Sequence, residues 1–147
     1  MLYIEFDILS DQKFDTFLEI YPIIVEANHS ESPKSIDFWL ILIPPFAKAY
    51  FNLVAHNHPD FDSYKLDFRM MMDYLQINLE VDYKECISTT VGKGRLEFVP
   101  LSYPYGGMDR LLLFLSAFDC KATTIDSGFG IKKVIWHSDL EFSCKTL

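Results

Sequence analysis

The segment from Met108 to Phe118 is the feature that most constrains the fold of this chain. It has the composition of a helix, and its residues are apolar on nearly every side except at Asp109, Arg110 and Ser116. A helix on the surface of a globular protein keeps one polar face toward water, whereas a helix that is apolar all round has to be covered on all sides. We therefore expect this segment to be the most buried helix and part of the core.

Other helical patterns lie in the first half of the chain. In residues 11–21 the apolar side chains recur at i, i+3, i+4 and i+7, and Ser10 offers a hydroxyl to cap the helix. Pro22 is expected to end or kink this helix, because proline lacks the N–H donor and its ring opposes the preceding turn. We expect further helices from Ser32-Pro33, as cap and first residue, to about Ile43, where Pro44-Pro45 stops the helix, and over residues 62–75. Residues 46–54 fit a short helix or a buried strand, and Ala47 and Ala49 favour the helix. A loop is expected over 56–60.

Strand patterns dominate the second half. Residues 1–8 alternate apolar and polar side chains, as a strand with one dry and one wet face does. Residues 77–90 and 95–101 form a pair of candidate strands separated by a glycine-bearing hairpin loop, and three more candidates follow at 121–125, 131–136 and 140–145. The 147 residues suit one domain. We predict a single α+β domain over residues 1–147, with helices mainly in the first half and a mostly antiparallel sheet in the second, joined by the strand at residues 1–8.

Acidic charge is concentrated in the first half. Residues 1–73 contain 12 Asp and Glu against 5 Lys and Arg, a net charge of -7, whereas residues 74–147 contain 9 against 8, a net charge of -1. A lopsided negative field repels nucleic-acid phosphates and anionic membranes and speeds encounters with basic surfaces. We therefore expect a basic protein partner, and neither nucleic acid nor a membrane.

Three acidic residues form a row along the helix expected at 11–21. Asp11, Asp15 and Glu19 lie at i, i+4 and i+8, where like charges repel by roughly 0.2 to 0.5 kcal/mol per pair. The row has two interpretations: a solvated helix face that promotes solubility, or a surface that recognises a basic partner. We take Asp11, Asp15 and Glu19 as candidate partner-binding residues, with Glu5 and Asp7 expected to widen the patch.

One dense group of side chains has metal-binding character. In His56-x-His58-x-Asp60-x-Asp62, an extended backbone would place both imidazoles and both carboxylates on one face. The string resembles the H-x-H-x-D-H motif of metallo-β-lactamase-like hydrolases, but Phe61 stands where the final histidine belongs. A polar loop with Pro59 at its bend explains the same residues, so we expect no metal and no cofactor, and keep a small metal-dependent hydrolase as the alternative.

Cysteine usage and the N-terminus point to a reducing compartment. Cys86, Cys120 and Cys144 have no C-x-x-C spacing, so we expect reduced, mostly buried thiols. The first residues carry acidic side chains where a secretory signal has basic ones, which favours the cytoplasm. No frame for an activated nucleophile such as G-x-S-x-G is present, and we expect a protein that is not an enzyme.

In size and composition the chain is similar to small bacterial immunity proteins, which bind and neutralise toxins, nucleases especially. The similarity rests on the acidic charge, the length and a 16% share of aromatic residues, and it includes no motif, so no residue role is carried over. It implies a non-enzymatic module for one cognate toxin, with fast encounter from charge steering and slow release from buried aromatic side chains. The oligomeric state stays open.

Overall fold

The computed structural model describes residues 1–28, 30–57 and 68–147, without the side chains of residues 53–57. Within these ranges the helices are α1 (Asp11–Asn28), α2 (Ile36–Leu42), α3 (Pro45–Asn57), α4 (Phe68–Asp73), the short π-helix η1 (Tyr74–Asn78) and α5 (Asp109–Ser116). The strands are β1 (Leu2–Ile8), β2 (Val81–Thr90), β3 (Lys93–Pro100), β4 (Cys120–Asp126), β5 (Ile131–Trp136) and β6 (Phe142–Thr146). Helices dominate the first half and strands the second, which confirms the predicted α+β class.

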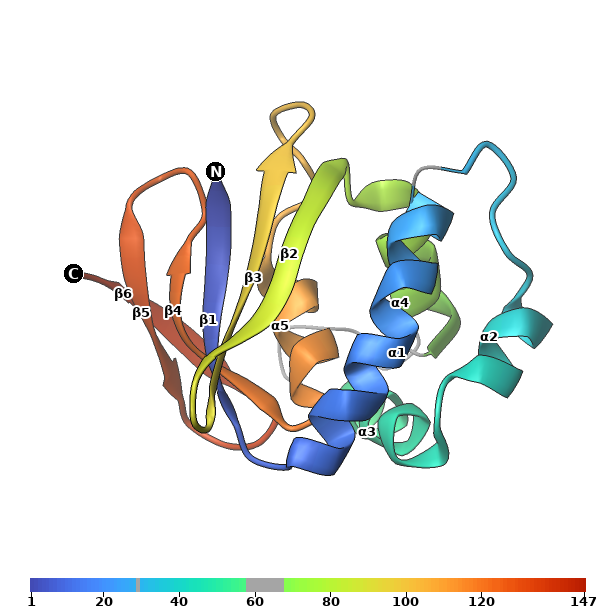
Figure 1. Cartoon of the computed structure of the whole chain (residues 1–147), viewed down its shortest axis with the longest axis horizontal. Helices are drawn as coiled ribbons and strands as arrows, with labels where there is room; N and C mark the ends of the chain where they lie inside the picture. Colours follow the sequence, from blue (N-terminus) through green and yellow to red (C-terminus); the bar gives the residue numbers. More distant parts are fainter. Residues whose placement is uncertain (29, 58–67) are drawn as a thin grey trace.

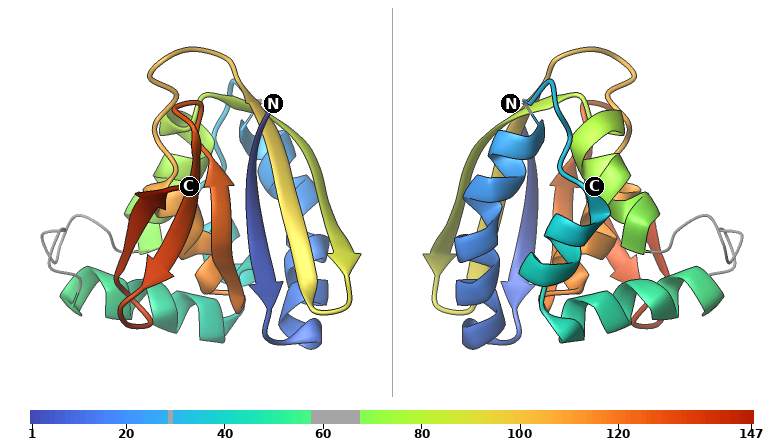
Figure 2. Two further views of the ribbon diagram at one scale, coloured as in Figure 1. Left: turned by 90° about the vertical axis from the view of Figure 1, so that its left-hand side faces the viewer. Right: turned by 90° about the vertical axis from the view of Figure 1, so that its right-hand side faces the viewer.

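The strands form one antiparallel sheet in the order β2-β3-β1-β4-β5-β6. β1 lies inside this sheet, between β3 of the β2–β3 hairpin and β4. The expectation that residues 1–8 form a strand of the sheet is confirmed, whereas its neighbours were not predicted. The helices pack on one face of the sheet (Figure 1). The other face is turned to the viewer in the left panel of Figure 2, and no described helix lies over it. Any surface formed by a described helix therefore lies on that one side of the sheet.

Helix α5 lies in the middle of the core. The five residues Leu111–Leu115 are all buried. On the side away from the sheet, the ring of Phe114 lies 6.0 Å from that of Phe17 in α1 and 5.7 Å from that of Phe51 in α3. The helix is thus enclosed between the sheet and a second layer of helices, which explains why its sequence has no polar face and confirms its expected burial.

Helix α1 continues past Pro22 to Asn28. The prediction that the helix could end at Pro22 was therefore wrong. Pro22 lies on the exposed side of the helix. Beyond it, Ile24 and Ala27 are buried, and the side-chain amide of Asn28 donates to two carbonyl oxygens, those of Leu75 and Leu79, both at 2.8 Å. These interactions outweigh the roughly 3 kcal/mol that an interior proline costs a helix. No helix in the described ranges is both long and apolar enough to cross a membrane.

Helix α2 begins later than predicted, with Ser35 as its cap in place of Ser32. The hydroxyl oxygen of Ser35 accepts a hydrogen bond from the N–H of Phe38 at 3.3 Å. The backbone of Lys34 is bound by the side chain of Gln76, which accepts from its N–H at 2.7 Å and donates to its carbonyl at 3.3 Å. Because Gln76 uses both backbone groups of Lys34, the helix starts after that residue.

The boundaries around residue 77 also differ from prediction. η1 continues from α4 to Asn78, so residues 77–80 are not part of a strand, and β2 begins at Val81. Of the helix predicted over 62–75, residues 62–67 lie outside the described ranges. Pro45 is the first residue of α3, a position where proline is favoured because the first N–H of a helix has no partner within it.

Candidate binding sites

An acidic stripe runs along the solvent side of α1. Asp11, Asp15 and Glu19 are exposed, and beyond Pro22 the same side of the helix continues with exposed Glu26. Within the described ranges none of these four carboxylates has an ion-pair partner. We call Asp11, Asp15, Glu19 and Glu26 the α1 stripe. The prediction missed Glu26 because it expected a break at Pro22.

The one basic residue of α1 is turned away from the stripe. The amine of Lys13 lies 3.1 Å from a carboxylate oxygen of Asp119 and 4.8 Å from the ring centroid of Phe46. Other acidic residues are paired in the same manner, including Asp82 with Lys84 at 2.6 Å. The α1 stripe is therefore a place where negative charge is left uncompensated in the described part of the protein.

Glu5 and Asp7 do not extend the stripe. Both alternate along β1 with Ile4 and Phe6, which are buried under the helices, so their side chains lie on the opposite face of the sheet from α1. Asp7 forms an ion pair with Lys93, its cross-strand neighbour on β3. The structure thus brings Asp11, Asp15 and Glu19 together but separates them from Glu5 and Asp7.

The histidine and aspartate string falls mostly outside the described residues. His56 lies in the last turn of α3, so residues 56 and 57 are helical and the prediction that they belong to a loop was wrong. The side chain of His56, and all of His58, Asp60 and Asp62, lie outside the described part. Within that part, no group of three or more His, Cys, Asp or Glu side chains is placed to hold a metal ion.

The three cysteines are free thiols, as predicted. Cys86 and Cys120 are buried, and burial raises the pKa of the Cys86 thiol to about 12 and that of Cys120 well above its ordinary value. Neither is a reactive thiolate near neutral pH. Cys144, in contrast, is exposed on the edge strand β6. Burial of part of its surface is the largest cause that raises its pKa.

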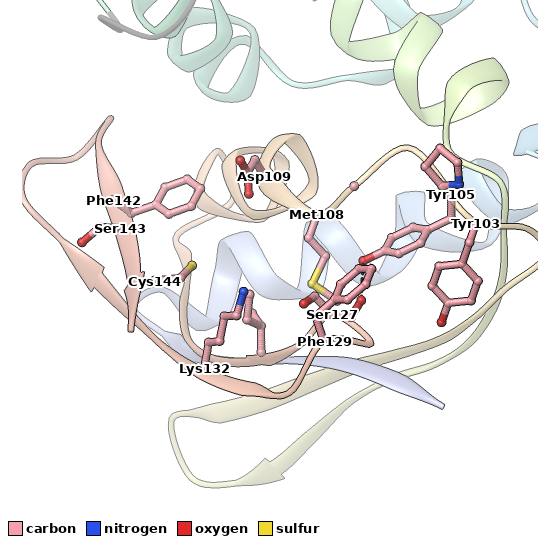
Figure 3. Close-up of a pocket in the computed structure, with 13 residues that line it drawn as sticks. Tyr103, Tyr105, Met108, Asp109, Ser127, Phe129, Lys132, Phe142, Ser143 and Cys144 are labelled. Carbon is pink, nitrogen blue, oxygen red and sulfur yellow. Dashed lines mark hydrogen bonds between the residues drawn. The ribbon is translucent and has the colours of Figure 1, made fainter. Parts of the chain in front are cut away.

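A cavity of about 710 Å³ opens beside Cys144, between the last three strands and the start of α5 (Figure 3). Its size is within the usual range for sites that bind small organic molecules. We call it the β6 cavity. Its lining comes from the β3–α5 loop, the first residues of α5, the β4–β5 turn and strands β4 to β6: Tyr103, Pro104, Tyr105, Gly107, Met108, Asp109, Ile125, Ser127, Phe129, Lys132, Phe142, Ser143 and Cys144.

Aromatic side chains dominate the rim of the β6 cavity. Phe129 is 75% exposed and Tyr103 is 60% exposed, and their ring centroids lie 6.3 Å apart in an edge-to-face arrangement. Tyr103 also contacts Tyr105 edge to face at 5.9 Å. Phe142 packs on Trp136 at 5.0 Å on the other side. Among the Phe, Tyr and Trp residues of the described ranges, Tyr103 and Phe129 are the exposed ones, and both lie at this cavity and not on α1.

Charged groups enter the β6 cavity from two directions. Lys132 projects from β5 on the same face as buried Val134, and its amine reaches into the cavity, while Asp109 lies across from it on α5 (Figure 3). The two do not form an ion pair, and within the described ranges the amine of Lys132 has no acceptor. Neither residue was assigned a binding role from the sequence, where Asp109 was noted only as a polar exception in the α5 segment.

The structure thus offers two separate binding features: an uncompensated acidic stripe and an apolar cavity with one cationic and one anionic group. The first suits a basic surface, and the second suits a small molecule with an apolar body and a charged group. Compared with models of protein families, with curated proteins and with solved structures, the chain matches none.

Proposed function

We propose that the protein is a non-enzymatic binding module whose α1 stripe covers a basic surface of another protein. The observation that carries the proposal is the stripe: four exposed carboxylates along 18 residues of helix. Helix stability explains only Asp11, which lies in the first turn, where the helix dipole favours a carboxylate. It does not explain the rest of the stripe, because Asp15 repels both Asp11 and Glu19 by roughly 0.2 to 0.5 kcal/mol each. Glu26 lies in the last turn, where the helix dipole disfavours a carboxylate.

Within this class, the size, charge and composition support a cytoplasmic immunity protein that neutralises a nuclease toxin. A nuclease has to bind phosphates, which it does with lysine and arginine side chains, so its substrate surface is positive. An acidic helix face is complementary to such a surface and would block substrate access while it is bound. The free thiols of the chain are compatible with a reducing compartment.

The proposal is tested with the product of the adjacent open reading frame, since an immunity protein is expected to be encoded beside its toxin. The two proteins are purified and mixed, and the association rate is measured at low ionic strength and at about 0.2 M salt. We expect the double variant Asp15→Lys/Glu19→Lys to associate about tenfold more slowly at low salt, with a weaker salt dependence, because steering depends on the charge product.

The matched control is Glu97→Lys/Glu141→Lys, which changes the net charge by the same amount at partly exposed positions outside α1. This control should associate nearly as fast as the unmodified protein, and both variants should melt at similar temperatures. Equal slowing in both would mean that net charge alone acts. Unchanged association in the α1 variant would reduce the stripe to a solvated helix face, and absence of any complex would contradict the assignment of a toxin partner.

A further inference from the structure

We propose that the β6 cavity binds a small organic anion: a compound with a flat apolar body and one carboxylate or sulfonate group, anchored by Lys132. This site shares no residue with the α1 stripe and needs no protein partner, so it goes beyond the binding function proposed above. The proposal rests on three observations, which concern the walls of the cavity, the rigidity of its rim and the charge that enters it.

The walls fit a flat apolar body. Met108 and Ile125 line the cavity and are buried. The rings of Phe129 and Phe142 lie on different sides of it (Figure 3). Aromatic walls favour aromatic or flat aliphatic ligands, because offset and edge-to-face contacts add to the gain from apolar burial. Phe129 is 75% exposed in the free protein, and a ligand in the cavity would remove part of that surface from water.

The rim that carries Tyr103 and Tyr105 is held in place by hydrogen bonds. The hydroxyl of Tyr74 donates to the carbonyl of Gly107 at 2.7 Å, and the N–H of Glu80 donates to the carbonyl of Tyr105 at 2.8 Å. The hydroxyl of Tyr105 in turn donates to the carbonyl of Ser127 at 3.1 Å, which joins the loop to the β4–β5 turn. A preformed site loses little conformational entropy when a ligand binds.

Lys132 sets the charge of the ligand. Its amine enters an apolar cavity without an acceptor from the described residues, although buried or half-buried cations are normally paired. A carboxylate or sulfonate would supply that acceptor. Asp109 lies in the wall at α5, so the anionic group has to sit near Lys132 and away from Asp109, which limits the ligand to one anionic end.

The test uses 8-anilinonaphthalene-1-sulfonate, whose naphthalene and phenyl rings and single sulfonate match the proposed class, and whose fluorescence rises in an apolar site. We expect saturable binding at one site per chain. Lys132→Met should weaken the affinity about ten- to hundredfold, as loss of one charge-assisted hydrogen bond does. The neutral analogue N-phenyl-1-naphthylamine should bind the protein and the Lys132→Met variant equally well.

The matched control is Lys133→Met, which makes the same change on the next residue of β5, where the side chain is exposed on the other face of the sheet. It should leave the affinity for the sulfonate unchanged. Equal affinities in the two variants would overturn the anchoring role of Lys132. Loss of both probes on Lys132→Met, or fluorescence that rises without saturation, would overturn the site itself.

A measurement without substitutions locates the probe. Cys144 lines the cavity and is exposed, whereas Cys86 and Cys120 are buried, so mild alkylation with iodoacetamide should modify Cys144 first. Saturating 8-anilinonaphthalene-1-sulfonate should slow this modification several-fold, as determined by mass spectrometry of the peptide that contains residue 144. An unchanged rate of alkylation at saturation would show that the probe binds elsewhere and would contradict the proposal.

Discussion

Gly106 passes so close to Asn78 that a Cβ atom on residue 106 would lie 2.6 Å from the carbonyl oxygen of Asn78. This contact ties the rim of the β6 cavity to the end of η1. Gly106 has a φ of +106° and its neighbour Gly107 a φ of +77°, but the space around Gly107 is open. Substituting each glycine in turn therefore distinguishes two costs to stability: the cost of a side chain at positive φ, which both positions share, and the cost of a clash with Asn78, which only residue 106 has.

We expect Gly106→Ala to be clearly more destabilising than Gly107→Ala. Both changes force a side chain into a left-handed conformation, at roughly 1 to 3 kcal/mol. Only Gly106→Ala adds a clash with backbone, which cannot rotate away as a side chain can. The check is urea denaturation of both variants; equal stability losses would show that the contact with Asn78 is not tight in solution.

Shortening single buried side chains of α5 tests whether this helix is the centre of the core. Leu112 and Leu115 are fully buried, and changing either to Ala should reduce the free energy of unfolding by about 2 to 5 kcal/mol, because a cavity is left in a packed interior. Leu9, which is 62% exposed, provides the surface control, and Leu9→Ala should cost far less. A loss below about 1 kcal/mol at both buried positions would contradict the described core.

Pro22 offers a prediction of opposite sign. It lies on the exposed side of α1, within an otherwise continuous helix, where alanine is favoured over proline by up to about 3 kcal/mol. Alanine also restores the N–H donor to the carbonyl of Leu18, while it gives the unfolded chain more freedom. We expect Pro22→Ala to raise the melting temperature. A lower melting temperature would mean that the proline fits this position better than the general rule allows.

The same proline shows where local rules reach their limit. A rule about one residue predicts a break at Pro22, but the buried side chains of Ile24 and Ala27 and the two hydrogen bonds from Asn28 come from tertiary packing. The burial of α5 was predictable because its apolar residues occupy every side of a single helix. The strands were predictable because apolar and polar residues alternate along each of them. Alternation shows which residues share a face of a strand but not which strands are neighbours, so the order of the strands in the sheet was not predictable.

The β6 cavity was beyond prediction because its walls come from several segments between residues 103 and 144 that meet only through the sheet. A weak signal was present. Phe129 lies between Gly128 and Gly130, and Tyr103 lies next to Pro104 in a segment that ends with Gly106 and Gly107. An aromatic ring in such a turn belongs to neither face of a strand. Lys132 gave no signal, because a lysine next to another lysine is most often a solvated pair. Alternation along β5 does not help, since each of its two faces carries one lysine and two apolar residues.

The histidine string calls for a direct measurement. We expect protein purified without chelator to contain no stoichiometric zinc, manganese or iron by elemental analysis, because the motif lacks its final histidine at Phe61. The double variant His56→Ala/His58→Ala serves as the comparison and should have the same metal content. About one metal ion per chain that is lost in the double variant would contradict this prediction and favour the hydrolase alternative.

Stability should fall at alkaline pH, and Cys86 should account for a measurable part of the loss. Burial raises the pKa of its thiol from 9.0 to about 12, so above pH 9 the unfolded chain releases this proton while the folded protein retains it. The unfolded state then binds fewer protons, and the free energy of unfolding falls as pH rises from 9 toward 12, by at most about 1.4 kcal/mol per pH unit from this group. Below about pH 8 the thiol is protonated in both states, and the group contributes no pH dependence.

The variant Cys86→Ala isolates this contribution. It should be less stable than the unmodified protein at about pH 7.5 because a buried side chain is truncated. Its stability should then fall less steeply toward about pH 10.5, since the thiol is gone while the buried tyrosines, whose pKa values are also raised, remain in both proteins. Urea denaturation at several pH values gives both slopes, and parallel slopes would show that Cys86 ionises in the folded protein as readily as in the unfolded chain.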